Sequence, residues 1–298
     1  MINIIYIFAF LIRKTRGTWK KWNVNRDLAY WSSQKSKIIV NKNNAIRIEE
    51  LGLRENGLKS VKENLERSKH VVIANIDQDG FFLSHFGPIE GVPCVGQENF
   101  LPRKRFLIDL VTIDGKVGIK KNYKKDCNKF LCEMEALHCL SSAGCNVPTI
   151  LDADFKNYSL TMSYIPGKVL REELASRGAI LRDRDVDENP QFIPLSPGAR
   201  KLKRIDEGKK YLRDIVNEDF IEKLFDQVIK IHAAGFKIYD MKYGNIIIEK
   251  KTGNPFLIDF ESSENLKGMG KPWITALYEG DIERFNLLFG TDKKPYQR

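Results

Sequence analysis

The sequence predicts an α+β fold, and three observations indicate it. Apolar stretches separated by turn residues between positions 71 and 123 predict short antiparallel strands. An apolar stripe at helical spacing runs through residues 126–143 and predicts a helix. A second helical pattern, residues 219–232, precedes two apolar runs that a turn separates. We therefore expect a small antiparallel sheet followed by a mainly helical part, with a helical extension before both.

The composition is that of a globular chain. Its 298 residues are 42% hydrophobic, enough for one large domain or two small ones. The net charge of +10 suits nucleotides, phosphorylated glycans, nucleic acid or an anionic membrane surface, and does not choose among them. The five cysteines form no C-x-x-C pair, and an odd number cannot all be bridged within the chain. A reducing, cytoplasmic compartment is therefore expected.

The first 22 residues combine an apolar run with basic and aromatic residues. The run, residues 1–12, is shorter than the roughly 20 residues that span a bilayer, and it lacks the preceding basic region of a signal peptide. Two interpretations stay open. The segment is either a peripheral anchor on the inner face of an anionic membrane, or a first strand or helix packed on the rest of the protein. We expect residues 1–69 to form the N-terminal extension.

Two hairpins are expected in the sheet. Residues 71–74 and 81–83 flank an Asp-Gln-Asp-Gly turn signal, and residues 105–112 and 116–123 flank an Asp-Gly turn. Between the hairpins lies a segment, residues 87–105, that is rich in Gly and Pro and ends in three basic residues. It is either a flap whose backbone amides and cations face phosphate, or an irregular loop with a solvated basic end.

The helix expected over residues 126–143 contains two glutamates, and helical geometry separates them. At about 100° per residue, Glu133 falls inside the apolar stripe and Glu135 on the far side. A carboxylate inside an apolar stripe is costly unless a cation pairs with it. We therefore expect Glu133 to pair with a lysine. His138 lies outside the stripe and is expected to be solvated. The stripe consists of Phe130, Met134, Leu137 and Leu140.

Three polar residues flank the predicted C-terminal hairpin. Asp240 and Asn245 stand in the spacing D-x-x-x-x-N directly before the apolar run 246–248, and Asp259 directly follows the return run 256–258. A hairpin brings the residues before its first strand and after its second strand to one end. These side chains can supply a general base and two metal ligands for phosphate transfer.

This pattern resembles the protein-kinase-like superfamily. Asp240 matches the catalytic-loop aspartate and Lys242 the lysine of D-x-K-x-x-N. Asn245 matches the second metal ligand, and Asp259 the aspartate of D-F-G, which reads D-F-E here. The passage over residues 144–167 resembles the hinge region of aminoglycoside phosphotransferases, RIO kinases and lipopolysaccharide-core sugar kinases, the atypical branch. The resemblance implies a bilobal fold.

In that fold, residues 70–162 would form the N-lobe and residues 163–298 the hinge and C-lobe. The segment Val-Gly-Ile-Lys ending at Lys120 resembles the V-A-I-K of the third kinase strand, so Lys120 is expected to bind the phosphates of ATP with Glu133 as its partner. Lys121 points to the opposite face by strand alternation, so only one of the two lysines can occupy the site.

The resemblance also implies roles for the hinge and for the segment after it. Hinge backbone would bind the adenine edge, and Met162 and Ile165 can also contribute to the core. The residues expected to line the base pocket are Met162, Ser163, Tyr164 and Ile165. The segment 170–217 carries a basic cluster over residues 200–210. It either recognises the acceptor or is a partly disordered, solvated loop.

Three further residues bear on the region around Asp240. Tyr239 stands where kinases usually have an arginine, so no arginine at that position reads a phosphorylated activation loop. Asp281 is a candidate for the aspartate that braces the catalytic loop. His232 is expected to form a structural hydrogen bond.

The resemblance implies an ATP- and Mg²⁺-dependent phosphotransferase that acts on a hydroxyl acceptor. No A-P-E motif follows Asp259, and the remaining chain is short. This favours a sugar or lipid-linked glycan, including an anionic one, as the acceptor. The alternatives are an atypical serine/threonine protein kinase and a nucleotide-binding pseudokinase scaffold. A nucleic-acid partner is not expected.

Overall fold

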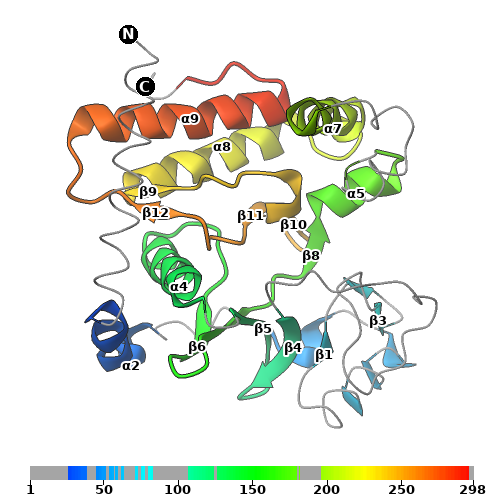
Figure 1. Ribbon diagram of the computed structural model, residues 1–298. Helices are drawn as coiled ribbons and strands as arrows, with labels where there is room; N and C mark the ends of the chain where they lie inside the picture. The colour runs from blue at the N-terminus through cyan, green and yellow to red at the C-terminus, as the bar shows by residue number, and fades with distance from the viewer. Residues whose placement is uncertain are drawn as a thin grey trace. The chain divides into compact units, whose positions relative to one another are not determined.

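The protein has an α+β fold with a small antiparallel sheet and a helical part, as seen in a computed structural model (Figure 1). The contacts between residues divide the chain into two units. Unit 1 comprises residues 1–138 and 148–164, and unit 2 comprises residues 139–147 and 165–298. The structure describes residues 26–38 and 45–51, parts of 54–82, and residues 107–123, 126–179, 181 and 196–294.

A five-stranded antiparallel sheet forms the centre of unit 1, with the strand order β1-β4-β5-β7-β6. A separate hairpin pairs β2 with β3 around the predicted turn. Its first strand is not the predicted residues 71–74, because Val71 and Val72 pair with β4 instead. The strands are β1 (Val71–Val72), β2 (Asn75–Asp77), β3 (Gly80–Phe82), β4 (Leu107–Ile113), β5 (Lys116–Asn122), β6 (Ile150–Asp154) and β7 (Ser159–Ser163).

The predicted Asp-Gly hairpin joins β4 to β5. Asp114 and Gly115 both have positive φ, 52° and 74°, and Ile113 pairs with Lys116 across the turn. Two consecutive residues with positive φ give a two-residue turn whose twist matches that of the flanking strands. The register of β4 against β5 is therefore set locally by these two residues.

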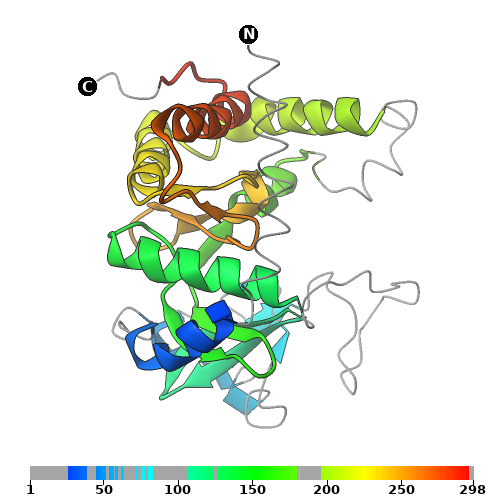
Figure 2. The same ribbon diagram turned by 60° about the vertical axis from the view of Figure 1, so that its left-hand side comes forward.

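Helix α4 (Cys127–Ser142) confirms the predicted helix, and the boundary between the two units falls within it. Figure 2 shows it lying alongside the strands of the sheet. Glu133 is buried and Glu135 is half-buried, as the helical phase predicted. The four residues of the apolar stripe are each 0% exposed: Phe130, Met134, Leu137 and Leu140.

The described part of the N-terminal extension contacts the sheet of unit 1. Residues 26–33 are helical, followed by α2 (Lys35–Ile38) and a 3-10 turn, η2 (Ile48–Leu51). The backbone N–H of Val117 donates to the carbonyl of Ile46, 2.8 Å away. The segment that would contact a membrane, residues 1–22, lies outside the described residues.

His138 corrects one sequence-based expectation. It is half-buried, and its ring meets the Trp31 ring edge-on, with 5.6 Å between centroids. Burial lowers the pKa of the imidazole from its usual value. The helical phase of α4 could not show this contact, because Trp31 lies about a hundred positions earlier in the chain.

Unit 2 contains four helices among its described residues, together with two small sheets. Helices α8 and α9 lie side by side in both views (Figures 1 and 2). The helices are α5 (Leu170–Ser176), α7 (Pro197–Leu212), α8 (Glu218–Ala233) and α9 (Lys271–Phe289), with the 3-10 turn η3 (Tyr243–Asn245). The strands are β8 (Gly167–Val169), β9 (Phe236–Lys237), β10 (Ile246–Glu249), β11 (Pro255–Leu257) and β12 (Glu264–Asn265).

Local signals define the starts of α7 and α8. The Ser196 side chain accepts from the N–H of Ala199 with proline at the first turn of α7, and the Asn217 side chain accepts from the N–H of Phe220. The basic cluster at residues 200–210 therefore lies on a helix, and not on a disordered loop. Residues 182–195 of the same segment lie outside the described part of the chain.

Candidate functional site

The β10–β11 hairpin brings the predicted site residues of unit 2 to one end. Ile246 pairs with Leu257, and the N–H of Ile258 donates to the carbonyl of Asn245, 3.0 Å away. Asp259 follows directly. The predicted strands and the turn between them are therefore present, and Asn245 and Asp259 leave the hairpin at the same end.

Asp240 and Lys242 join Asn245 at this end. The side-chain Nδ2 of Asn245 donates to the carbonyl of Asp240, 2.9 Å away. The Lys242 ammonium lies 2.5 Å from the Asp240 carboxylate, and both side chains are about half exposed. Because Nδ2 is used in this bond, Oδ1 remains as the acceptor of the Asn245 amide, and oxygen is the atom type that a magnesium ion prefers.

Two residues at the end of the hairpin that carries Asp240 and Asn245 have a backbone conformation that is unusual for residues other than glycine. Tyr239 has φ of 59° and Asp259 has φ of 66°. The left-handed region costs energy for a side chain with a Cβ atom, and such residues persist where surrounding contacts hold them. The contacts that hold the loop around Asp240 come from α8, α9 and the β9–β12 pair.

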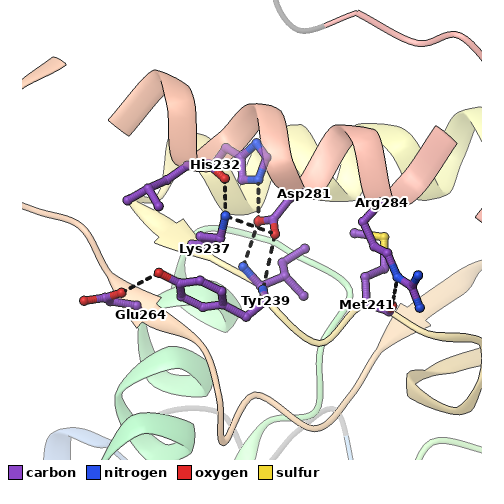
Figure 3. Close-up of polar contacts among 9 residues, drawn as sticks. His232, Lys237, Tyr239, Met241, Glu264, Asp281 and Arg284 are labelled. Carbon is purple, nitrogen blue, oxygen red and sulfur yellow. Dashed lines mark hydrogen bonds and ion pairs between the residues drawn. The ribbon is translucent and has the colours of Figure 1, made fainter. Parts of the chain in front are cut away.

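Asp281 of α9 holds the backbone directly before Asp240 (Figure 3). Its Oδ2 accepts from the N–H of Ile238 at 2.9 Å and from His232 Nε2 at 3.0 Å, and its Oδ1 accepts from the N–H of Tyr239 at 3.3 Å. The residue is only 3% exposed, so these donors offset the cost of burying its charge. The expected bracing role of Asp281 and the structural hydrogen bond of His232 are both found.

Lys237 and Tyr239 connect the same loop to the segment that follows Asp259. The Tyr239 hydroxyl donates to Glu264 at 2.8 Å, and the Lys237 ammonium lies 4.6 Å from the centre of the Tyr239 ring. Lys237 also donates to the carbonyl of Leu277. Sequence reasoning missed Lys237 and Glu264, although a lysine in the otherwise apolar stretch Gly-Phe-Lys-Ile was a usable signal.

Arg284 lies one helical turn after Asp281. Whereas Asp281 bonds to the backbone before Asp240, Arg284 bonds to the residue directly after it. Its Nε donates to the carbonyl of Met241, 3.1 Å away (Figure 3). Burial lowers the pKa of the guanidinium, and the negative charge of Asp240 opposes that shift. Sequence reasoning missed this residue as well. Arg284 follows Asp281 by three residues, and this spacing places both side chains on one face of a helix. That spacing was the signal from which the contact could have been predicted.

In unit 1, Lys121 and not Lys120 pairs with Glu133. The Lys121 ammonium is 2.7 Å from the Glu133 carboxylate, which also accepts from the Tyr123 hydroxyl at 2.5 Å. Lys120 points to the other face of β5 and is half-buried. The predicted glutamate is therefore correct and the predicted lysine is wrong, because α4 packs against the face of β5 that carries the odd-numbered side chains.

The predicted hinge residues lie at the end of β7, the last strand of unit 1 in the chain, and directly after it. Met162 and Ser163 are buried. The N–H of Ser163 donates to Thr149 at 2.8 Å, and the N–H of Tyr164 donates to Val117 at 3.3 Å. Both donors are therefore used within the unit and are not available to a base. Burial raises the pKa of Tyr164 to about 12. Ile165 is the first residue of unit 2 after Tyr164.

Comparison with protein-family models finds no match, and no curated protein matches at a significant level. Among the described residues, no helix has the length and apolar character needed to cross a membrane. The predicted phosphate-covering segment, residues 87–105, lies outside the described part of the chain.

Proposed function

We propose that this chain is an ATP- and Mg²⁺-dependent phosphotransferase of protein-kinase-like, bilobal fold that acts on a hydroxyl acceptor. The acceptor class proposed is a sugar or a lipid-linked glycan. The observation that carries the proposal is the meeting of Asp240, Lys242, Asn245 and Asp259 at one end of a hairpin, on a loop that buried polar contacts hold in a strained conformation.

The donor set at this end suits magnesium. Mg²⁺ is bound by oxygen atoms, commonly one or two from the protein together with substrate phosphates. The Nδ2 atom of Asn245 is committed to the Asp240 carbonyl, which orients Oδ1 as the ligand atom, and Asp259 contributes a carboxylate. The bound ion would supply charge neutralisation of the transferring phosphate.

The roles of the protein groups follow from their charges. Asp240 accepts the proton of the acceptor hydroxyl, and Lys242, which is already paired with that carboxylate, stabilises the charge of the transferring group. Lys121 takes the place that the sequence resemblance gave to Lys120 and binds nucleotide phosphate, with Glu133 and Tyr123 fixing its position. These roles need a polar loop with little freedom, which the contacts of Asp281 provide.

The proposal is tested with γ-labelled ATP and cell extract fractionated into protein, glycolipid and small-molecule pools. Label should move to an acceptor only with Mg²⁺, and chiefly in the glycolipid or small-molecule pool. Asp240→Asn and Asp259→Ala should each reduce transfer by a factor of about 10² or more, because electrostatic groups at a reacting centre usually contribute that much. Asp214→Ala, at an exposed position of the same unit, is the control.

Three results would count against parts of the proposal. Nucleotide binding without Mg²⁺-dependent turnover would indicate a scaffold. Label found mainly on seryl or threonyl residues of many proteins would indicate a protein kinase. Retention of more than about a tenth of the activity by Asp259→Ala would remove that residue from the metal site.

A further inference from the structure

Arg284 presents a cation beside the proposed base. Its guanidinium reaches from α9 to the residue directly after Asp240 and is held there by the bond from Nε to the Met241 carbonyl. Figure 3 shows Asp281 and Arg284 approaching the loop from the same helix. The bond to Met241 uses one of the five N–H groups of the guanidinium.

The terminal nitrogens of Arg284 have no hydrogen-bond partner among the described residues. Among the described residues, the buried side-chain atoms that lack a partner do not include these nitrogens. The terminal nitrogens of Arg284 therefore keep access to solvent. Burial lowers the pKa of the guanidinium even though the negative charge of Asp240 opposes that shift, which means that the charge is partly desolvated. A partly desolvated cation with open donors gains more from an incoming anion than a fully hydrated one does.

Two cations lie close to Asp240. The Lys242 ammonium is paired with its carboxylate, and the negative charge of Asp240 also acts on the Arg284 guanidinium. The neighbouring Tyr243 supplies no anion, because burial raises the pKa of its hydroxyl, which donates to the carbonyl of Leu288. Lys242 already has a role toward the transferring phosphate. Arg171, whose guanidinium lies against Gly244 of the same loop, is paired with Glu172, so Arg284 is the better candidate for the acceptor.

The basic cluster on α7, residues 200–210, is a weaker candidate for binding the acceptor. Lys209 and Lys210 are paired with Asp206 and Glu207 of their own helix, at positions three residues before them. These pairs leave little uncompensated charge at that end of the helix.

We propose that Arg284 binds an oxyanion, a phosphate or carboxylate group carried by the acceptor, and so places the acceptor hydroxyl at Asp240. This inference rests on the proposed phosphotransferase function. A guanidinium suits the task because its planar fork binds phosphate and carboxylate oxygens through two parallel hydrogen bonds. The acceptor would then carry its own charged group near the hydroxyl that receives the phosphate.

The first test uses the wild-type chain and does not depend on turnover. Arginines are modified with phenylglyoxal and mapped by mass spectrometry in the presence of glycerol, glycerate or glycerol 3-phosphate, at constant ionic strength. Glycerate or glycerol 3-phosphate, or both, should slow modification of Arg284 at least about threefold, whereas glycerol should not. Arg177, an exposed arginine of unit 2, is the internal reference.

The pattern of protection decides the result. Protection by glycerate, by glycerol 3-phosphate or by both identifies the preferred oxyanion. Equal protection by glycerol, equal protection of Arg177, or no protection of Arg284 overturns the proposal. Protection by Mg²⁺ and ATP alone, in the absence of any probe, assigns the guanidinium to the nucleotide and overturns the acceptor role.

The second test compares variants on the labelled acceptor found in the fractionated extract. Arg284→Gln should raise the acceptor KM by about tenfold or more, the range of a charge-assisted hydrogen bond, with a smaller change in the KM for ATP. Arg284→Lys should recover part of the loss, and Arg177→Gln should change neither constant. A KM change confined to ATP overturns the proposal. If no transfer is seen at all, the proposed function fails, while the modification experiment still reports on the anion site.

Discussion

Lys121 and Glu133 form a buried ion pair in which the two charged groups are 2.7 Å apart and the side chains are 8% and 1% exposed. The Tyr123 hydroxyl is a second donor to the same carboxylate. The energy of such a pair is asymmetric, because removing one partner leaves the other charged group buried without compensation. Lys120, the adjacent residue on the opposite face of β5, offers a matched control.

Lys121→Met should reduce both stability and nucleotide binding. The free energy of unfolding should fall by about 3–5 kcal/mol, the usual cost of leaving a buried partner uncompensated. Lys120→Met, a change of the same side-chain size and charge, should have a much smaller effect. Chemical denaturation and nucleotide titration measure the two quantities. Equal effects of the two variants would show that the pair with Glu133 has no special role.

Asp281→Asn should slow turnover and loosen the backbone before Asp240. The amide presents an N–H group toward donors at Ile238, Tyr239 and His232, so at least one of these bonds is lost. A displacement of about 1 Å at a catalytic group can cost roughly 10²-fold in rate. Faster hydrogen exchange at the Ile238 and Tyr239 amides should accompany the lower kcat. Glu283→Gln, at an exposed position of α9, should leave both unchanged.

Gly208→Ala should destabilise the protein, although glycine in a helix interior is normally unfavourable. A Cβ atom at position 208 would overlap the Tyr243 ring, which belongs to the turn η3 between Asp240 and β10. Overpacking of this kind typically costs about 1–3 kcal/mol. Gly198→Ala in the same helix meets nothing within 4 Å and should be neutral or slightly stabilising. Thermal unfolding of the two variants gives the comparison, and equal melting temperatures would contradict the close packing.

His138 should make the stability of the protein dependent on pH on the acid side of neutrality. Burial lowers the pKa of its imidazole in the folded state, so the unfolded chain binds the proton more readily. The stabilising contribution is therefore complete above the unfolded pKa, near 6.5, and is lost as pH falls toward the lower folded pKa. Melting temperatures of the wild type and His138→Gln between about pH 5 and 8 should converge toward low pH. A constant difference would contradict the shift.

Local chemistry made several features predictable from the sequence. The Asp-Gly turn defined the β4–β5 hairpin, because its two residues readily adopt positive φ. The 3.6-residue period of α4 identified Glu133 as the buried glutamate. The apolar runs on either side of residues 251–254 predicted a hairpin that places Asn245 and Asp259 at one end. Each of these inferences depends on residues that are close in sequence.

Tertiary packing decided what sequence spacing left open. Strand alternation showed that Lys120 and Lys121 point in opposite directions, but only the packing of α4 against one face of β5 selects Lys121. His138 is half-buried because Trp31, from a distant segment, covers it. Arg284 reaches Met241 because α9 returns to the loop around Asp240 some 40 residues later. Partners far apart in sequence carry no local signal. Most of the elements and the faces that they bury could therefore be predicted from the sequence, whereas the pairing of charged side chains depends on the fold.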